Sequence, residues 1–504
     1  MKKKSGLLFI IRIVKLLVGI LNLSLTAKYF GVSLEKDVWL LALSVVLFLD
    51  MAIWGPINET FRSKFIFLRG EEGENEALQK TKSLLIFSLI ISICLVCLIF
   101  IYPQFLAKII APTYSGLQYG KLIKMILIAA PILLITQLSA IATSILNAYE
   151  SFFVPEITGF ATSIINLFLL IFLAPYIGIN SLVLSYYIGA LLLLILLILQ
   201  IKKLKISIFS YSNIKFNDFK IFFIFALPFF LPYSFGQISA VLEKTLVSTL
   251  GIGYVSALDY SRKFTDIFTN VLTSVLVTML VPVLSSKFIE KKTREFIASF
   301  MEILQLGLLL LSFVIPVFTS CSLSFVFIFF NKGKIPSNML FQISELTIYY
   351  SWSILAVFIY VIFGMALLSS NRSKKYALLG VCAQVISIVI NLIFISTVGI
   401  YIFPISLFIS HFISGLIMGH HFPYKSKKLI LVFFKYIGIL VLTTVIVFFV
   451  NKMFDNNIDP FLHIISNLIF IAILILGSLY LFNLDEKKIV YKYIMKFKLK
   501  CQNF

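Results

Sequence analysis

Apolar runs long enough to cross a lipid bilayer recur along almost the whole chain. A spanning helix needs about 20 predominantly apolar residues, because backbone N–H and C=O groups cannot stay unpaired in hydrocarbon. About fourteen such runs are separated by charged residues, proline or glycine, at 6–30, 37–61, 83–103, 122–147, 153–175, 180–201, 219–250, 255–285, 296–320, 340–369, 374–397, 401–421, 428–451 and 459–483. Because 60% of the 504 residues are hydrophobic and only 13% are charged, we predict an all-α polytopic membrane protein.

The formal charge of +21 comes from short basic loops between these runs. If the N-terminus is cytoplasmic, the loops after even-numbered spans carry most of the Lys and Arg, as the positive-inside rule requires. These segments are 62–82, 202–215, 287–294, 372–375 and 425–428, followed by the basic tail 487–500. We therefore predict that both termini are cytoplasmic, and the loop pattern argues against nucleic acid as a partner.

Cysteine and histidine do not form a metal-binding pattern in this sequence. Cys94 and Cys97 lie inside an apolar run, and no second CxxC pair accompanies them. The four histidines lack an HExxH motif and adjacent carboxylates. We predict no metal site, no cofactor and no catalytic residue.

Ionisable residues inside the apolar runs are concentrated in 234–274. At steps of three and four, which place side chains on one helical face, this part of the 255–285 run carries Asp259, Arg262, Lys263, Asp266, Thr269, Asn270, Thr273 and Ser274. The preceding run adds Ser234, Gln237, Glu243, Lys244 and Ser248. Charges facing lipid cost about 2.5 to 3.5 kcal/mol each, so these helices should face a protein-lined interior.

Oppositely charged residues four apart on this stripe can meet on one helical face. They form two predicted pairs, Asp259 with Lys263 and Arg262 with Asp266. The stripe therefore has two interpretations: it lines a wet, substrate-binding cavity, or it is a set of buried ion pairs that only hold helices together.

An internal repeat relates the two halves of the chain. The string SIINLFLLIFLAPYIGI from Ser163 resembles SIVINLIFISTVGI from Ser387, which aligns Asn166 with Asn391. SKF recurs at 63–65 and 286–288, and Phe30-Gly31 corresponds to Leu250-Gly251. We predict two parallel six-span repeats around a central cavity. The resulting domains are an N-lobe at 1–201, a cytoplasmic linker at 202–218, a C-lobe at 219–421, and two further spans with a basic tail at 422–504.

The repeat makes the first two spans the partners of the polar spans described above. The first carries Arg12, Lys15, Gly19, Asn22 and Thr26 on one face, and the second carries Asp37, Ser44, Asn58, Glu59 and Arg62, with Asp50 off that face. Arg12 and Lys15 have a second interpretation, in which they reach the cytoplasmic headgroups. The candidate substrate-binding residues are therefore Arg12, Lys15, Asn22, Asp37, Glu59, Gln237, Glu243, Lys244, Asp259, Arg262, Lys263, Asp266 and Asn270.

Several motifs resemble those of one known family. They are YFGVSLEKDVW from Tyr29, WGPINETF from Trp54, SILNAYESFFVP ending at Pro155, QISAVLEKTLVSTL with LDYSRKF, and LLSSNRSKK. Over about residues 10–420 the chain resembles the lipid II flippases (MurJ, formerly MviN) of the multidrug/oligosaccharidyl-lipid/polysaccharide exporter superfamily. The cavity arginines of that family correspond here to Lys263, Leu16, Asn22 and Asp50, with Lys15 adjacent.

The resemblance implies a transporter, not an enzyme, in a bacterial inner membrane. Its substrate would be a polyprenyl-pyrophosphate-linked sugar, lipid II or a related cell-envelope precursor, moved from the cytoplasmic to the outer leaflet by alternating access. Membrane potential or a monovalent cation would supply the energy, and membrane lipids and glycan-assembly enzymes would be partners. Alternatives are an O-antigen or capsule repeat-unit flippase, and a cation-coupled drug or metabolite antiporter that uses Asp37 or Asp50.

A membrane enzyme that uses the same lipid-linked donors is the alternative from another functional class. Such enzymes usually carry catalytic residues in a long external loop or in an acidic metal-binding motif. The loops between the apolar runs of this chain are short, which favours transport over catalysis.

Overall fold

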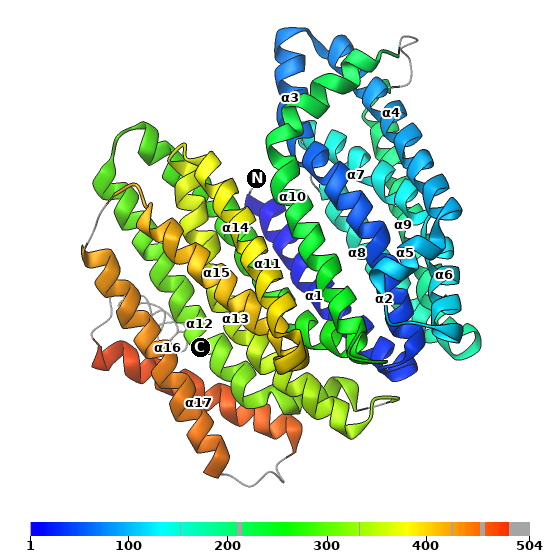
Figure 1. Ribbon diagram of the computed structural model, residues 1–504. Helices are drawn as coiled ribbons and strands as arrows, with labels where there is room; N and C mark the ends of the chain where they lie inside the picture. The colour runs from blue at the N-terminus through cyan, green and yellow to red at the C-terminus, as the bar shows by residue number, and fades with distance from the viewer. Residues whose placement is uncertain are drawn as a thin grey trace, which may run out of the picture. The chain divides into compact units, whose positions relative to one another are not determined.

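The computed structural model describes residues 2–151, 153–208, 214–331, 333–424, 427–453 and 459–482 (Figure 1). Within these ranges every regular element is a helix, which confirms the predicted all-α class. The helices of the first half are α1 (Lys2–Phe30), α2 (Leu34–Leu49), α3 (Gly55–Glu71), α4 (Glu74–Ile101), α5 (Pro103–Ile110), α6 (Gly116–Ala129), α7 (Ile132–Ala148), α8 (Phe153–Ile177), α9 (Asn180–Lys203) and α10 (Phe216–Ser248). Those of the second half are α11 (Tyr254–Ile289), α12 (Thr293–Phe330), α13 (Ser337–Ser369), α14 (Ser373–Val398), α15 (Ile402–His420), α16 (Lys427–Met453) and α17 (Pro460–Leu481).

The helices coincide with the fourteen predicted spans. Eleven segments of the described chain are long and apolar enough to cross a membrane, and one of them, Ser373–His420, contains two predicted spans. The other two predicted spans are α1 and α11, which contribute the shorter apolar stretches Leu17–Phe30 and Leu280–Ile289. The eight-residue α5 was not predicted, because a helix this short cannot span a bilayer and leaves no apolar run of spanning length.

The chain forms two compact units. The first contains residues 1–260, 332–336 and 384–402, and the second contains 261–331, 337–383 and 403–504. The boundaries fall inside α11 and α14, and α10 belongs to the first unit, where it packs against α2, α3 and α4. These units therefore do not coincide with the predicted lobes, which placed α10 in the C-lobe, and the two-lobe assignment stays a prediction.

Aromatic side chains join α3 and α10 in the core of the first unit. The Phe61 ring stacks on Phe222 with 5.4 Å between centroids and on Phe65 with 5.7 Å. Trp54 and all three phenylalanines are fully buried or nearly so. The packing holds α3 beside α10 (Figure 1), and this position matters for the pocket described below.

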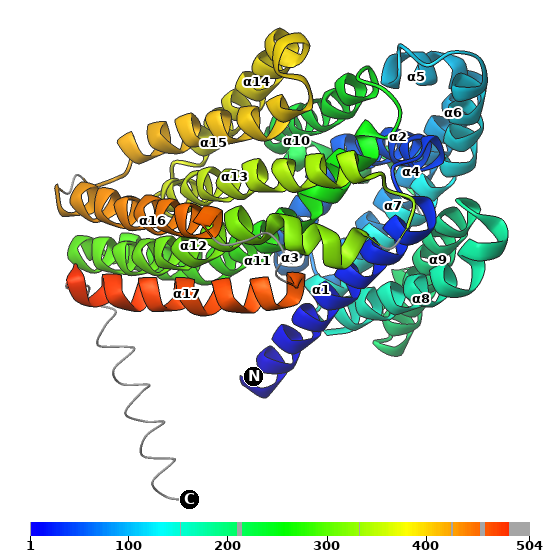
Figure 2. The ribbon, with the colours of Figure 1, turned by 90° about the horizontal axis from the view of Figure 1, so that it is seen from below.

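In the second unit, α12 is the helix around which α13, α16 and α17 pack (Figure 2). A polar cluster joins three of these helices: Asn451 and Asn467 exchange side-chain hydrogen bonds of 2.7 and 3.0 Å, and His463 bridges Asn451 and Ser324 at 2.9 Å each. Side-chain hydrogen bonds between helices are one of the forces that associate helices in lipid. The cluster attaches the two C-terminal spans to the rest of this unit.

Left-handed backbone residues recur at corresponding turns of the two halves. The pairs, each separated by about 220 residues, are Gly31 with Gly251, Gly73 with Lys291, Glu150 with Asn371, and Gly178 with Gly399. All eight have φ between 55° and 131°. Because helix-terminating turns of this kind are local features, their repetition agrees with the internal repeat predicted from sequence.

Close helix packing in the second unit depends on Gly415 of α15. A Cβ at this position would lie 2.9 Å from the Ile359 Cγ2 and 2.9 Å from the Tyr360 backbone nitrogen of α13. We predict that Gly415→Ala lowers the melting temperature of the detergent-solubilised protein by several degrees, because overpacking costs about 1–3 kcal/mol. The measurement is a thermal melt followed by size-exclusion chromatography.

Gly438 of α16 provides the matched control, since nothing lies within 4 Å of a Cβ placed there. Gly438→Ala should leave the melting temperature unchanged or slightly raised, because Ala is the better helix former. Equal melting of both variants would contradict the packing argument.

Candidate functional site

Asp37 of α2 caps the N-terminus of α11 within the first unit. Its carboxylate accepts hydrogen bonds from the Gly253 backbone N–H at 2.5 Å, the Ser256 N–H at 2.8 Å and the Ser256 hydroxyl at 2.5 Å. The first N–H groups of a helix lack intrahelical partners and carry partial positive charge, so a carboxylate is a favourable cap. Asp37 is fully buried, and the structure therefore gives this candidate substrate ligand the role of a helix cap.

A buried ion pair adjoins this cap. Lys36 Nζ lies 3.4 Å from Asp259 Oδ2, with side chains 6% and 17% exposed, and 5.4 Å from the centroid of the Tyr260 ring. The Tyr260 hydroxyl donates to the Gly31 carbonyl oxygen at 3.0 Å. The structure thus gives Asp259 a partner 223 positions earlier in the chain, and its predicted pairing with Lys263, four residues along the helix, stays a prediction.

The candidates on α10 lie in the same unit. Lys244 Nζ donates to the Leu40 carbonyl oxygen of α2 at 3.4 Å. Gln237 and Glu243 are half-buried on the same helix. Lys244 thus adds a polar contact to the packing of α10 against α2.

The polar face of α1 lies against α8. The Asn22 amide donates to the Ser163 carbonyl oxygen at 3.1 Å, and Lys15 Nζ would lie 3.1 Å from a Cβ placed on Gly159. The helix backbone continues through Arg12, whose side chain is outside the described residues. Asn22 therefore takes part in helix packing, and the Lys15 ammonium group lies close to Gly159 of α8, while its headgroup interpretation stays a prediction.

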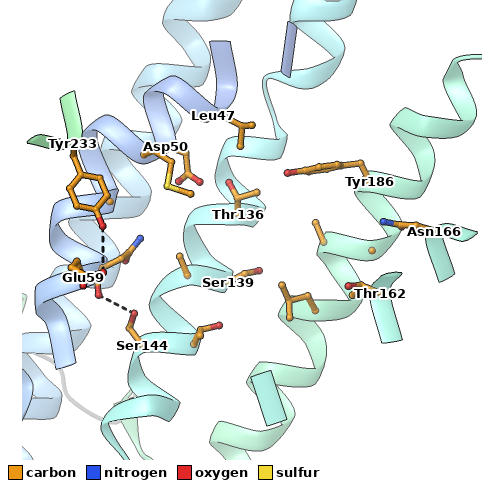
Figure 3. Close-up of a pocket in the computed structure, with 18 residues that line it drawn as sticks. Leu47, Asp50, Glu59, Thr136, Ser139, Ser144, Thr162, Asn166, Tyr186 and Tyr233 are labelled. Carbon is orange, nitrogen blue, oxygen red and sulfur yellow. Dashed lines mark hydrogen bonds between the residues drawn. The ribbon is translucent and has the colours of Figure 1, made fainter. Parts of the chain in front are cut away.

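A cavity of about 580 Å³ opens in the first unit between α2, α3, α7, α8, α9 and α10 (Figure 3). Asp50 and Thr136 point toward each other, and the Tyr233 hydroxyl donates to Glu59 at 3.4 Å (Figure 3). Tyr186 and Asn166 form the opposite wall. The polar residues of the lining are Asp50, Asn58, Glu59, Thr136, Ser139, Thr143, Ser144, Thr162, Asn166, Tyr186 and Tyr233.

A π-helical turn explains why sequence analysis separated Asp50 from Glu59. Residues Asp50–Trp54 form a π-helix, whose hydrogen bonds run i to i+5, between α2 and α3. Because a π-helical turn is wider than an α-helical turn, the residues before it and after it are rotated relative to one another about the helix axis. A prediction made with α-helical spacing therefore puts Asp50 on the wrong helical face. The same join brings Gly55 against the Tyr233 ring, where a Cβ would lie 2.6 Å away. Such π-turns occur frequently at functional sites.

In the second unit Arg262, Asp266, Thr269 and Asn270 of the α11 stripe line a smaller pocket of about 210 Å³ with α13 and α15. The predicted pair of Arg262 with Asp266 is confirmed, with 3.4 Å between Nε and Oδ1. Asn270 lines the same pocket, and Lys263 is exposed on the same helix.

This second pocket also contains a buried histidine that was not among the predicted site residues. His411 lies about two and a half turns before the end of α15 and is only 8% exposed, and its Nδ1 is 3.1 Å from the Leu407 carbonyl oxygen. A lone histidine in an apolar run carries no signal for such a position. The described residues bring together no group of three His, Cys, Asp or Glu side chains suited to a metal ion.

The candidates thus fall into separate groups. Glu59 lines the large pocket, and Arg262, Asp266 and Asn270 line the smaller one. Asp37 and Asp259 join α2 to α11. The single cavity between two lobes stays a prediction.

Removing one partner of the buried Lys36–Asp259 pair should destabilise the protein. We predict that Asp259→Ala lowers the melting temperature markedly, because it leaves the Lys36 charge buried, at a cost of about 3–5 kcal/mol. The double variant Lys36→Met/Asp259→Leu should recover most of that loss, since both charges are gone. Thermal melts of purified protein measure both effects.

Asp266→Ala is the control on the same helix. The Arg262–Asp266 pair is 37% and 39% exposed, so its loss should cost no more than about 1 kcal/mol. If Asp259→Ala melts like Asp266→Ala, the Lys36–Asp259 pair does not stabilise the fold.

Comparisons with known proteins agree with this architecture. The family model described as "Lipid II flippase MurJ" matches residues 26–469. A solved lipid II flippase MurJ in an inward closed conformation has a TM-score of 0.79 at 22% identity, covering 96% of this chain and 99% of that one. A search of curated proteins finds no match.

More distant solved structures share the fold. An inward-facing multidrug resistance MATE transporter of the MOP superfamily has a TM-score of 0.68 at 13% identity, covering 81% of this chain and 96% of that one. A MOP superfamily transporter from Pyrococcus furiosus has a TM-score of 0.61 at 13% identity, covering 83% and 94%. The family match extends over most of the chain, and this multi-pass membrane protein belongs to the lipid II flippase MurJ family.

Proposed function

We propose that this protein moves a polyprenyl-pyrophosphate-linked sugar from the cytoplasmic to the outer leaflet of a bacterial inner membrane. The family match over residues 26–469 is the observation that carries the proposal. The loop charges support an orientation with both termini in the cytoplasm. Lipid II, named in the description of the family, is the first candidate substrate.

Basic residues on polar helix faces fit a pyrophosphate head group. Arg262 and Lys263 of α11, Lys244 of α10 and Lys15 of α1 are ionisable groups inside a membrane protein, where such groups mark substrate pathways. Charge-assisted hydrogen bonds from Arg and Lys to phosphate oxygens are short and strong. The polyprenyl tail would remain in lipid while the head group crosses by alternating access.

The candidate functions differ in which lipid-linked glycan the protein carries. Where the family carries cavity arginines, this chain has Lys263, Leu16, Asn22 and Asp50, and Lys lacks the bidentate fork of Arg. These replacements of the basic positions make a related cell-envelope glycan, such as an O-antigen or capsule unit, the second candidate. Enzymes that assemble the glycan are the proposed protein partners.

Lys263 provides the test of substrate binding. We predict that the protein restores growth to cells depleted of their own lipid II flippase, and that Lys263→Ala reduces viable counts by at least about tenfold, because a charge contact to phosphate is lost. Lys263→Arg should rescue, and the exposed lysine of the α11–α12 turn gives the matched control Lys291→Ala.

Failure to rescue despite membrane expression would show that lipid II is not an acceptable substrate. The lipid-linked intermediate that accumulates in a deletion strain of the native host would then identify the glycan. Rescue by Lys263→Ala as strong as that of the wild type would remove Lys263 from the binding site.

Membrane potential is the proposed energy source. Moving two negative charges outward through about 100 mV, negative inside, is favourable by roughly 4.6 kcal/mol at about 2.3 kcal/mol per charge. We predict that an imposed potential of this sign speeds head-group translocation in proteoliposomes, and that the opposite sign slows it. Translocation independent of both potentials would exclude this coupling and favour a monovalent cation.

A further inference from the structure

The large pocket of the first unit contains buried oxygen atoms that lack partners. Asp50 is 7% exposed, and its Oδ1 has no hydrogen-bond partner among the described residues. The same holds, across the described part of the chain, for Oδ1 of Asn58 and Oδ1 of Asn166. All three residues line the pocket. An unpaired buried polar group costs about 1–3 kcal/mol, and a charged one more, so this pocket favours an occupant that donates hydrogen bonds or carries positive charge.

The charged residues that line the pocket also favour a cation. Asp50 and Glu59 are its ionisable carboxylates, and none of its described residues is Lys, Arg or His. The nearby hydroxyls of Thr136, Ser139 and Thr162 supply further oxygen atoms. Hard monovalent and divalent cations prefer oxygen ligands of this type, whereas a pyrophosphate would be repelled.

The size of the pocket limits the occupant. A volume of about 580 Å³ lies within the range of small-ligand sites and exceeds the space that one bare ion needs. With no cluster of three acidic or metal-binding side chains in the described residues, the site suits a partly hydrated cation or a protonated amine.

We propose that this pocket binds a small cation, either an alkali ion or a primary ammonium group, with Asp50 as its counter-charge. Asn58 and Asn166 would accept hydrogen bonds from the ion's water or from the ammonium group. A free alkali ion would be a coupling ion, whereas an ammonium group would belong to the translocated molecule. The binding of a cation is inferred independently of the proposed function. Only the identification of that cation as a coupling ion or as part of the translocated molecule rests on the proposed function.

Binding is tested on purified wild-type protein by thermal melts at constant ionic strength. Choline chloride provides the background, because its quaternary nitrogen donates no hydrogen bond, and it is replaced stepwise by NaCl, KCl or methylammonium chloride. A ligand that binds the folded state alone raises the melting temperature. We expect a rise on the order of 2–4 °C at saturation.

Asp50→Asn removes the charge and keeps the shape. It should abolish the cation-dependent rise, and in choline alone it should melt at or above the wild-type temperature, because no buried charge is left unpaired. Glu302→Gln, at an exposed acidic residue of α12, is the matched control and should keep the full rise. Asn166→Ala should raise the half-saturating cation concentration severalfold, which provides a second test if Asp50→Asn folds poorly.

The three salts distinguish the two sources. A rise with Na⁺ or K⁺ supports a free coupling ion, and a rise with methylammonium alone supports an ammonium group on the substrate. No rise with any salt, or an equal rise in Asp50→Asn, would overturn the proposal. Since no transport step is measured, either result is independent of whether lipid II or another glycan is carried.

Discussion

The capping of α11 by the buried Asp37 carboxylate is the interaction on which the first unit depends. The free N–H groups at a helix N-terminus need an acceptor, and inside a membrane protein no bulk water supplies one. Asp37 supplies it from α2, and Lys36 and Tyr260 add an ion pair and a hydrogen bond to the same junction. Two helix-connecting turns that lie more than 200 residues apart are thereby held together by polar contacts that are almost fully removed from solvent.

Two pockets of this protein are lined by ionisable groups in different combinations. The acid Asp50 and Glu59 line one pocket of the first unit, and Arg262 lies with Asp266 in a pocket of the second. Only the first of these linings is acidic, because the second holds a cation and an anion paired with each other.

Local features were predictable from the sequence. The spans and the pair of Arg262 with Asp266 each depend on residues close together in the chain. The pairing of Asp259 with Lys36 could not be predicted in this way, because it is made by tertiary packing. Asp50 was not among the predicted substrate-binding residues for another reason. The prediction used α-helical spacing, which does not hold across a π-helical turn.

The sequence by itself determined that the chain is a helical membrane protein with many apolar spans, because hydrocarbon leaves the backbone few alternatives to a helix. It also determined which helices carry ionisable groups. Only the tertiary structure decided what those groups do: Asp37 became a cap, Asn22 a packing contact and Asp50 a pocket residue with an unpaired oxygen. The reason is physical, since a buried charge takes its role from the donors and acceptors that folding brings within about 3 Å of it, and those come mostly from other helices.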